Sequence, residues 1–387
     1  MDPPPGSTSK AESLFDQVIK LGYRPGESAV ASMIASYAKF DKLDDAYSVY
    51  EEMVEKGFEI DTVTISILVN ALSTHGKHRE VDNIVRRSFQ DGLDLDTVAY
   101  NTFIKAMLEA GKLHFAVNIY ERMLSSGVIP SIQTYNTMIS VYGRGRKLDK
   151  AIDMFNIASQ SDISLDEKTY TNMISYYGKA GKVQEASLLF IKMQEEGLKP
   201  GKVSYNIMLN IYATVGLVDE AEKLFEAMKK NGCSPDSFTY LALVRAYSEC
   251  LKYSKAEEII KEMQKQAIHP SSSHFNVLVS AFSKAGLVED AERVFTEIRK
   301  AGFSPDLACC QSMMRGYMDY GHVEKGISFF ERIHKYVKAD RFVLSAAFHL
   351  LKASGEDLKA SGVLDSMNKL GVPLLSNLVV GSKREVG

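Results

Sequence analysis

The sequence predicts an all-α protein, an α-solenoid in which pairs of amphipathic helices stack into a right-handed superhelix. Three observations lead to this prediction. A short fragment recurs at a fixed spacing, apolar residues within each recurrence have helical periodicity, and glycine or proline stands where each apolar run stops. A helix pair of this kind cannot bury its apolar faces alone, so neighbouring pairs must pack on one another.

The repeat is clearest around Asn101, Asn136, Asn206 and Asn276, in the fragments AYNTFIK, TYNTMIS, SYNIMLN and HFNVLVS. These asparagines are separated by 35, 70 and 70 residues, so the period is 35 residues. A period of this size is typical of solenoids built from one supersecondary unit per repeat.

The stretch from Lys202 to Asp236 shows the composition of one unit. Apolar residues at helical spacing between Tyr205 and Tyr212 predict a first helix with one buried face. Gly216 then ends that helix, and a second amphipathic run lies between Val218 and Met228. Pro235 follows this run and stops it, so the unit reads as helix, turn, helix and loop.

The remaining chain divides into copies of this unit. Residues 1–26 match a truncated repeat that keeps only its second helix, and residues 376–387 form a polar C-terminal tail that we expect to fray. Between them, residues 27–375 hold ten units, of which the ninth is one residue short and ends at Asp340. The units begin at Glu27, Thr62, Thr97, Ile132, Glu167, Lys202, Ser237, Ser272, Leu307 and Arg341.

Two small-residue positions recur in the units. Alanine, which lets helices approach closely, stands at Ala46, Ala116, Ala151, Ala186, Ala221, Ala256, Ala291 and Ala360. A turn glycine stands at Gly76, Gly111, Gly181, Gly216, Gly286, Gly321 and Gly355. Val81 replaces the alanine in one unit, and Arg146 and Leu251 replace the glycine in two others. We interpret these departures as local packing variants, because the surrounding pattern persists.

Composition limits the function classes. The formal net charge of −3 does not by itself indicate a nucleic-acid partner, and no apolar run is long enough to span a membrane. The four cysteines have no disulfide or metal-site spacing, which favours a reducing compartment. The N-terminus MDPPPGSTSK is not a targeting presequence, so we expect that an address segment has been removed or that the chain is a fragment.

From about Lys10 to Leu375 the chain resembles the pentatricopeptide repeat family. The resemblance lies in the period of 35 residues and in three segments of the unit: the opening TYNTMI, the middle GKAGKVQEA and the end GLKPG. The constant unit length resembles the pure (P-class) repeat type. The resemblance implies a plant organellar protein, chloroplast rather than mitochondrion, that binds single-stranded RNA with one base per repeat. It also implies a role in RNA stabilisation, processing, splicing or translation. We expect a monomer without cofactor or metal.

In that family, the base is read by the fifth residue and the last residue of each unit. The resemblance implies uracil for Asn with Asp, guanine for Ser with Asp, and cytosine for Asn with Ser. The pairs here are Ala31 with Asp61, Ser66 with Asp96, Asn101 with Ser131, Asn136 with Asp166, Thr171 with Gly201, Asn206 with Asp236, Leu241 with Ser271, Asn276 with Asp306, Gln311 with Asp340, and Ser345 with Leu375.

Several of these pairs depart from the family pattern. Gly201 has no side chain, which leaves Thr171 a weak purine preference. We assign no base to the units of Ala31, Leu241, Gln311 and Ser345.

These residue types have the right chemistry and also ordinary structural roles. An asparagine amide offers a donor and an acceptor, and a carboxylate offers acceptors, so together they can address the edge of a base. An aspartate at the end of a unit is equally expected as the N-cap of the next helix. An asparagine at the fifth position is equally expected to bridge adjacent repeats. Capping, bridging and base contact can coexist in one residue.

Two further positions complete the predicted interface. Apolar residues stand second in half of the units, at Val63, Val98, Val203, Phe238 and Phe342, where they either sandwich a base or pack in the core. Cations near the end of the first helix, at Lys39, Arg144, Lys179 and Lys284, are candidates for phosphate contacts. Glu109, Glu249 and Asp319 hold the same position in other units, so this row of charge is patchy. The tyrosines before the fifth position fall on the stripe of core residues.

Catalytic interpretations find little support. His78-Arg79-Glu80 matches half of a zinc deaminase motif, but the Pro-Cys-x-x-Cys part is missing. Cys309, Cys310 and His322 have no common metal-site spacing, and Gly143-Arg144-Gly145 is an incomplete dinucleotide fingerprint. The alternative to RNA binding is a protein-interaction scaffold that holds a peptide or partner helix in its groove.

Overall fold

The structure is a computed structural model that describes residues 17, 26–160, 165–333 and 337–383. Over these residues the chain forms twenty α-helices and no β-strand. The predicted truncated repeat at residues 1–26 falls almost entirely outside the described residues. An all-α architecture is therefore confirmed for the described part of the chain.

The helices form ten consecutive pairs. The first helices are α2 (Glu27–Lys39), α4 (Thr62–Thr74), α6 (Thr97–Glu109), α8 (Ile132–Arg144), α10 (Glu167–Lys179), α12 (Lys202–Thr214), α14 (Ser237–Glu249), α16 (Ser272–Ala285), α18 (Leu307–Tyr320) and α20 (Arg341–Ser354). The second helices are α3 (Leu43–Glu55), α5 (His78–Gln90), α7 (Leu113–Ser125), α9 (Leu148–Gln160), α11 (Val183–Glu195), α13 (Val218–Lys230), α15 (Tyr253–Lys265), α17 (Val288–Lys300), α19 (Val323–Ile333) and α21 (Asp357–Lys369).

The turn between the two helices of a pair requires a left-handed residue. Gly76 and Gly216 adopt φ values of 73° and 72°, which cost a glycine little. Arg146 and Leu251, which replace this glycine, keep the same backbone with φ values of 54° and 58°. The two replacements therefore leave the turn intact, but the backbone of each replacing residue is strained, because a residue with a side chain disfavours the left-handed conformation. Asp41 does the same in the first pair, with φ 57°.

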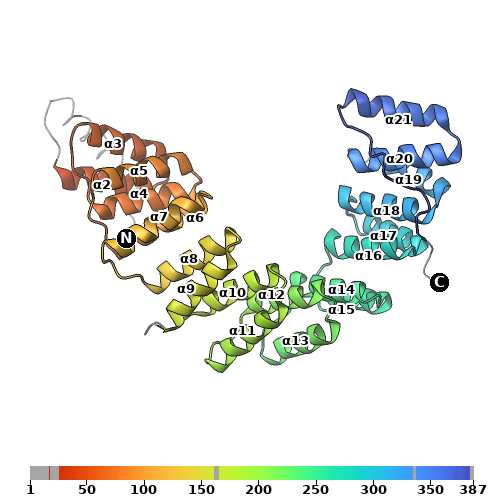
Figure 1. The fold of residues 1–387 in the computed structure, drawn as a ribbon, viewed down its shortest axis with the longest axis horizontal. Helices are drawn as coiled ribbons and strands as arrows, with labels where there is room; N and C mark the ends of the chain where they lie inside the picture. Colours follow the sequence, from red (N-terminus) through yellow and green to blue (C-terminus); the bar gives the residue numbers. More distant parts are fainter. Residues whose placement is uncertain (1–16, 18–25, 161–164, 334–336, 384–387) are drawn as a thin grey trace. The chain divides into compact units, whose positions relative to one another are not determined.

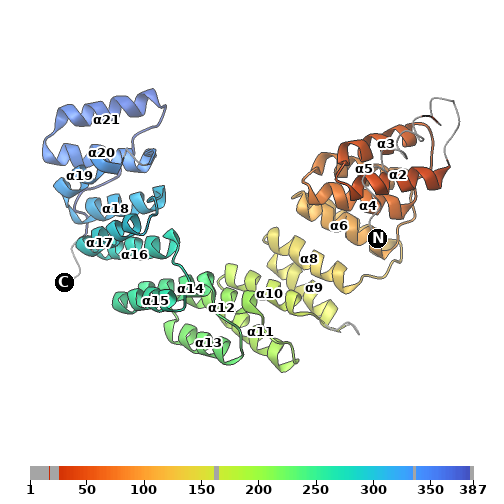
Figure 2. The same ribbon diagram turned by 180° about the vertical axis from the view of Figure 1, so that it is seen from behind.

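The chain divides into two compact units, one holding α2–α11 (residues 1–198) and the other α12–α21 (residues 199–387). Within each, every first helix packs against its own second helix and against the first helix of the next pair. Each second helix that is followed by a first helix in the same compact unit also contacts that helix; Figures 1 and 2 show the order of the pairs. Each compact unit is thus a helical-repeat stack, an α-solenoid segment whose first helices form a continuous layer.

Small residues permit this close stacking. The recurring alanines of the second helices, such as Ala46, Ala116 and Ala221, are at most 1% exposed. Val81, which replaces one of them, is also fully buried. In the first helices, the tyrosines expected in the core are at most 7% exposed: Tyr100, Tyr135, Tyr170, Tyr205 and Tyr240. These tyrosines are therefore core residues and not stacking platforms for bases.

Residues 376–383 of the C-terminal tail are attached to the fold, in contrast to the prediction that the tail frays. The backbone N–H groups of Gly381 and Lys383 each donate to carbonyls at the end of α18, those of Met318 and Asp319, at 2.8 Å. The ammonium of Lys383 also lies 2.9 Å from the Asp319 carboxylate. The sequence pattern missed this attachment because the contact joins residues far apart in the chain and has no counterpart in other repeats.

Across the part of the chain that the structure describes, no helix combines the length and apolar character that a membrane crossing requires.

Candidate nucleic-acid interface

The last residue of most predicted units caps the following first helix. The Asp61, Asp166 and Asp236 carboxylates accept hydrogen bonds from the backbone N–H three residues later, at 2.8, 2.8 and 3.0 Å. Burial raises the pKa of these three carboxyls. Hydrogen bonds from the threonine three residues later and from neighbouring groups lower the pKa by more, so the pKa of each carboxyl lies below its ordinary value. The predicted capping role is confirmed for Asp61, Asp96, Ser131, Asp166, Asp236, Asp306 and Asp340.

The fifth residue lies against this cap. Asn206 Nδ2 donates to Asp236 Oδ1 at 3.1 Å, and Asn276 Nδ2 donates to Asp306 Oδ2 at 2.7 Å. Asn101 Nδ2 donates to the Ser131 hydroxyl at 3.0 Å. The same contact joins Asn136 to Asp166 at 3.4 Å and Gln311 Nε2 to Asp340 at 2.7 Å. Five pairs are therefore brought together, four from residues 30 apart in the sequence and one, Gln311 with Asp340, from residues 29 apart.

The asparagines also bridge to the next first helix. The Thr134 hydroxyl donates to Asn101 Oδ1 at 2.6 Å, and the Thr239 hydroxyl donates to Asn206 Oδ1 at 2.6 Å. Thr169 makes the corresponding bond to Asn136. Sequence reasoning expected a bridge but did not identify these threonines. Their recurrence at the third position of several units was the signal that could have found them.

Other predicted pairs are arranged differently. Ser345 is fully buried, and its hydroxyl accepts a bond from the Leu375 backbone N–H at 3.1 Å. Thr171 is only 8% exposed, and its predicted partner Gly201 belongs to the other compact unit. Ser66 and Asp96 both line one cavity between α4 and α6.

Apolar second residues stand beside these pairs on the surface. Val63, Val98, Val203 and Phe238 are 64, 66, 64 and 72% exposed, so they are not packed in the core. A cavity of about 270 Å³ between α4 and α6 has Val63 and Val98 in its wall, together with the predicted reading residues. Its lining is Thr62, Val63, Ser66, Ile67, Asn70, Asp96, Val98 and Thr102. One concave site thus combines two exposed apolar side chains with a hydroxyl and a carboxylate.

The predicted phosphate-binding cations are all exposed at the C-terminal ends of first helices: Lys39, Arg144, Lys179 and Lys284. Lys179 also lies over the Tyr176 ring, 5.5 Å from its centroid. The acidic residue at this position in α18, Asp319, is paired with Lys383 of the tail. Lys383 therefore neutralises the acidic residue at this position, which the repeat pattern did not predict.

The weaker catalytic and metal motifs have structural explanations. A Cβ on Gly143 would lie 2.1 Å from the Tyr176 ring, so this glycine serves close helix packing. Cys309 and Cys310 are buried, and burial raises the pKa of the Cys310 thiol to about 11. Among the described residues, no group of three or more His, Cys, Asp or Glu side chains could hold a metal ion.

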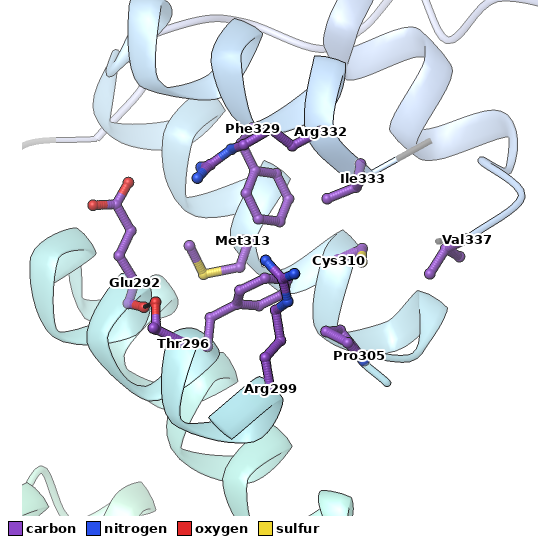
Figure 3. A pocket seen from close by; sticks show the side chains of 11 residues that line it. Glu292, Thr296, Arg299, Pro305, Cys310, Met313, Phe329, Arg332, Ile333 and Val337 are labelled. Atoms are coloured by element: carbon purple, nitrogen blue, oxygen red, sulfur yellow. Dashed lines mark hydrogen bonds between the residues drawn. The ribbon is translucent and has the colours of Figure 1, made fainter. Parts of the chain in front are cut away.

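A separate cavity lies among α17, α18 and α19 (Figure 3). Its volume of about 170 Å³ is below the roughly 300–1,000 Å³ that is usual for small-molecule sites. It is lined by Glu292, Phe295, Thr296, Arg299, Pro305, Cys310, Met313, Phe329, Arg332, Ile333 and Val337, none of which is a predicted reading residue.

Comparison with known families defines the class of the protein. The profile of the PPR repeat family matches residues 25–74, 95–144, 130–175, 165–214, 200–249 and 270–319. The PPR repeat profile also matches residues 238–268 and 308–336. These matches cover more than half of the chain, which therefore belongs to the PPR (pentatricopeptide) repeat family. A comparison with curated proteins finds no match.

Solved structures agree on the fold. The crystal structure of the pentatricopeptide repeat protein PPR10 from maize aligns with a TM-score of 0.56 and 20% identity, over 94% of this chain and 61% of PPR10. PPR10 in complex with an 18-nt psaJ RNA element aligns with a TM-score of 0.54 and 20% identity, over 95% and 62%. The chain thus spans less than two thirds of the length of PPR10. At this identity the likeness establishes the fold alone.

Proposed function

We propose that this protein is a sequence-selective single-stranded RNA-binding protein that reads one base per helix pair. The observation that carries the proposal is the cavity between α4 and α6, where Val63 and Val98 flank Ser66 and Asp96. Exposed apolar side chains on both sides of a flat base bury its faces, and the polar pair addresses its edge. The RNA-bound state of PPR10 supports the same use of the fold.

The other pairs supply the remaining readers. Val203 and Phe238 hold the same positions around Asn206 and Asp236 as Val63 and Val98 hold around their pair. The donor on the amide and the acceptors on the carboxylate complement a uracil, which offers an acceptor next to an N–H donor. The proposed reading units begin at Thr62, Thr97, Ile132, Glu167, Lys202 and Ser272.

The proposed base assignment follows the chain from its N-terminus, with the RNA running 5′ to 3′. The Ser66 unit reads G, the Asn101 unit C or U, and the Asn136 unit U. The Thr171 unit prefers a purine, the Asn206 unit reads U, the Leu241 unit is unread, and the Asn276 unit reads U. Phosphates contact the exposed cations Lys39, Arg144, Lys179 and Lys284.

Selection from a randomised single-stranded RNA library tests this proposal. We expect the selected pool to contain the seven-base core in register, with a pyrimidine at the Asn206 and Asn276 positions. A pool without pyrimidine enrichment at those two positions overturns the base assignment. Val63→Ala together with Val98→Ala should weaken binding for every sequence, whereas exposed Lys261→Ala on α15 is a matched control that should not.

The net charge of −3 favours the second candidate function, a protein-interaction scaffold that binds a peptide or partner helix in the same groove. The scaffold function would be supported if the protein failed to bind random RNA and specifically captured one protein from a size-matched protein lysate. For the RNA reader, we propose the P-class repeat type and a monomeric state. We further propose an organellar location, chloroplast rather than mitochondrion, and a role in RNA stabilisation, processing, splicing or translation, without catalysis.

A further inference from the structure

The buried threonine at the third position of a unit contacts the reading asparagine of the preceding unit. We infer that Thr134 is a positioning residue that decides which end of the Asn101 amide is presented to the RNA. In the Asn–Asp pairs the carboxylate is sufficient to orient the amide, even where a threonine also contacts it. This inference rests on the proposed function and adds a specificity determinant to it.

The hydrogen-bond directions in the Asn101 site are determined by its neighbours. The Thr134 hydroxyl accepts the Ser131 backbone N–H at 2.9 Å, which leaves its own hydrogen to donate to Asn101 Oδ1 at 2.6 Å. Thr134 is completely buried, so water does not compete for this bond. The amide oxygen therefore faces the next helix, and the amide nitrogen faces Ser131. Because this nitrogen has two hydrogens and one is used by Ser131, the second can reach a base.

The partner at the end of the unit determines whether the threonine is needed. An ionised carboxylate only accepts hydrogen bonds, so Asp236 holds the nitrogen end of Asn206 and repels its oxygen. A hydroxyl both donates and accepts, so Ser131 would tolerate either end of the Asn101 amide. Only Thr134 prevents the amide of Asn101 from turning end for end.

The chain contains a natural comparison in the Asn276 unit. Its third-position neighbour is Cys309 instead of a threonine, and Asn276 Oδ1 is buried without a hydrogen-bond partner among the described residues. Asn276 still donates to Asp306 at 2.7 Å. The Asn276 unit thus has a carboxylate partner but no threonine. The Asn101 unit has the threonine but no carboxylate partner.

An amide that turns would present its oxygen to the RNA and favour bases that offer a donor at that point. Thr134→Val removes the hydroxyl at nearly constant shape. Cytosine offers an acceptor at N3 and uracil a donor, so we expect the variant to lower the preference for cytosine over uracil at the Asn101 position about fivefold, the equivalent of one net hydrogen bond. Thr239→Val should lower the base preference at the Asn206 position less than about twofold, because the Asp236 carboxylate still orients the Asn206 amide.

Matched variants separate positioning from structural support. Both valine variants remove an acceptor from a capping box, so both should lower Tm by a similar amount. Thr134→Ser keeps the hydroxyl and should restore selectivity. Cys309→Thr should raise Tm, by satisfying Asn276 Oδ1, while selectivity at that position stays unchanged. Equal losses of selectivity in Thr134→Val and Thr239→Val, or no loss in either, would overturn the inference.

A measurement without RNA keeps the inference independent of the proposed function. In free protein labelled with ¹⁵N-asparagine, Thr134→Val should shift or double the side-chain NH₂ signals of Asn101, assigned by their loss in Asn101→Ser. The Asn206 signals should stay single in Thr239→Val. If wild-type protein shows no base preference, the proposed function fails, yet the NH₂ signals still test the amide orientation. Unchanged Asn101 signals in Thr134→Val would refute it.

Discussion

Two adjacent residues, Tyr205 and Asn206, should separate folding from base reading. Tyr205 is 1% exposed, and its hydroxyl accepts a hydrogen bond from Asn231 Nδ2 at 2.8 Å. Tyr205→Ala removes a whole aromatic side chain from the layer of first helices. We expect it to lower the free energy of unfolding by about 3–5 kcal/mol, as large aromatic truncations do. Its affinity should fall for every RNA sequence alike.

Asn206→Ser acts differently, because the side chain lies at the edge of the groove and is half-buried. The change removes the bond that Asn206 accepts from Thr239 and alters the one that it donates to Asp236. The cost should be about 1–2 kcal/mol, on the scale of one or two net hydrogen bonds. The variant has the same residue pair as Ser66 with Asp96, so its preference at that one base should move from U toward G. A well-made base contact of about 1–3 kcal/mol makes the switch measurable.

The assay is thermal unfolding of both variants by circular dichroism, with RNA affinity measured for U and G at the matching position. Asn206→Gln, which keeps an amide, is the control for size. The reasoning is refuted if Tyr205→Ala changes base preference while Asn206→Ser only lowers Tm. That outcome would mean that the assignment of reading and core positions is shifted by one residue throughout the repeat.

Three further predictions concern the backbone, the caps and the cations. Leu251→Gly should raise stability by about 1 kcal/mol, because it relieves a left-handed leucine with φ 58°; an unchanged or lower Tm would contradict this. The pKa of Asp236 is lowered in the folded state from 3.8, so its cap stabilises above that pH and is lost as pH falls through the folded pKa. The Tm difference between wild type and Asp236→Asn should therefore shrink in acid, and a constant difference would argue against an ionised cap. The logarithm of RNA affinity should fall against log salt with a slope of about 3, from roughly four phosphate contacts at ~0.7 each. Alanine at Lys39, Lys179 and Lys284 together should reduce that slope by about 2, whereas an unchanged slope would remove these lysines from the phosphate path.

The sequence predicted the elements of this protein well because its geometry repeats. Once a period of 35 residues is established, residues at equal phase must have equivalent surroundings. Helical spacing then separates core residues such as Tyr205 from edge residues such as Asn206, one position apart. The pairing of residues 30 apart, such as Asn206 with Asp236, could also be predicted from the sequence, because the last residue of one unit is the natural cap of the next first helix.

Other features depended on packing between helices, which a pattern within one repeat does not specify. An apolar second residue fits a core or a surface equally well by sequence, and only the stacking of α4 on α6 leaves Val63 and Val98 exposed on the two sides of one cavity. The attachment of Lys383 to Asp319 joins residues that share no period. It arises because the tail returns along α20 to the end of α18.

By itself, the sequence determined the helix pairs, their order and the phase of the candidate readers, because each of these follows from local periodicity and the chemistry of caps and turns. The tertiary structure alone decided which readers also bind a threonine of the next unit, and in which direction that hydrogen bond runs. Thr134 and Asn101 are 33 residues apart, and the direction of the bond between their side chains depends on the neighbours that surround both of them. Such directions are set by donor and acceptor geometry in three dimensions, which residue identity does not encode.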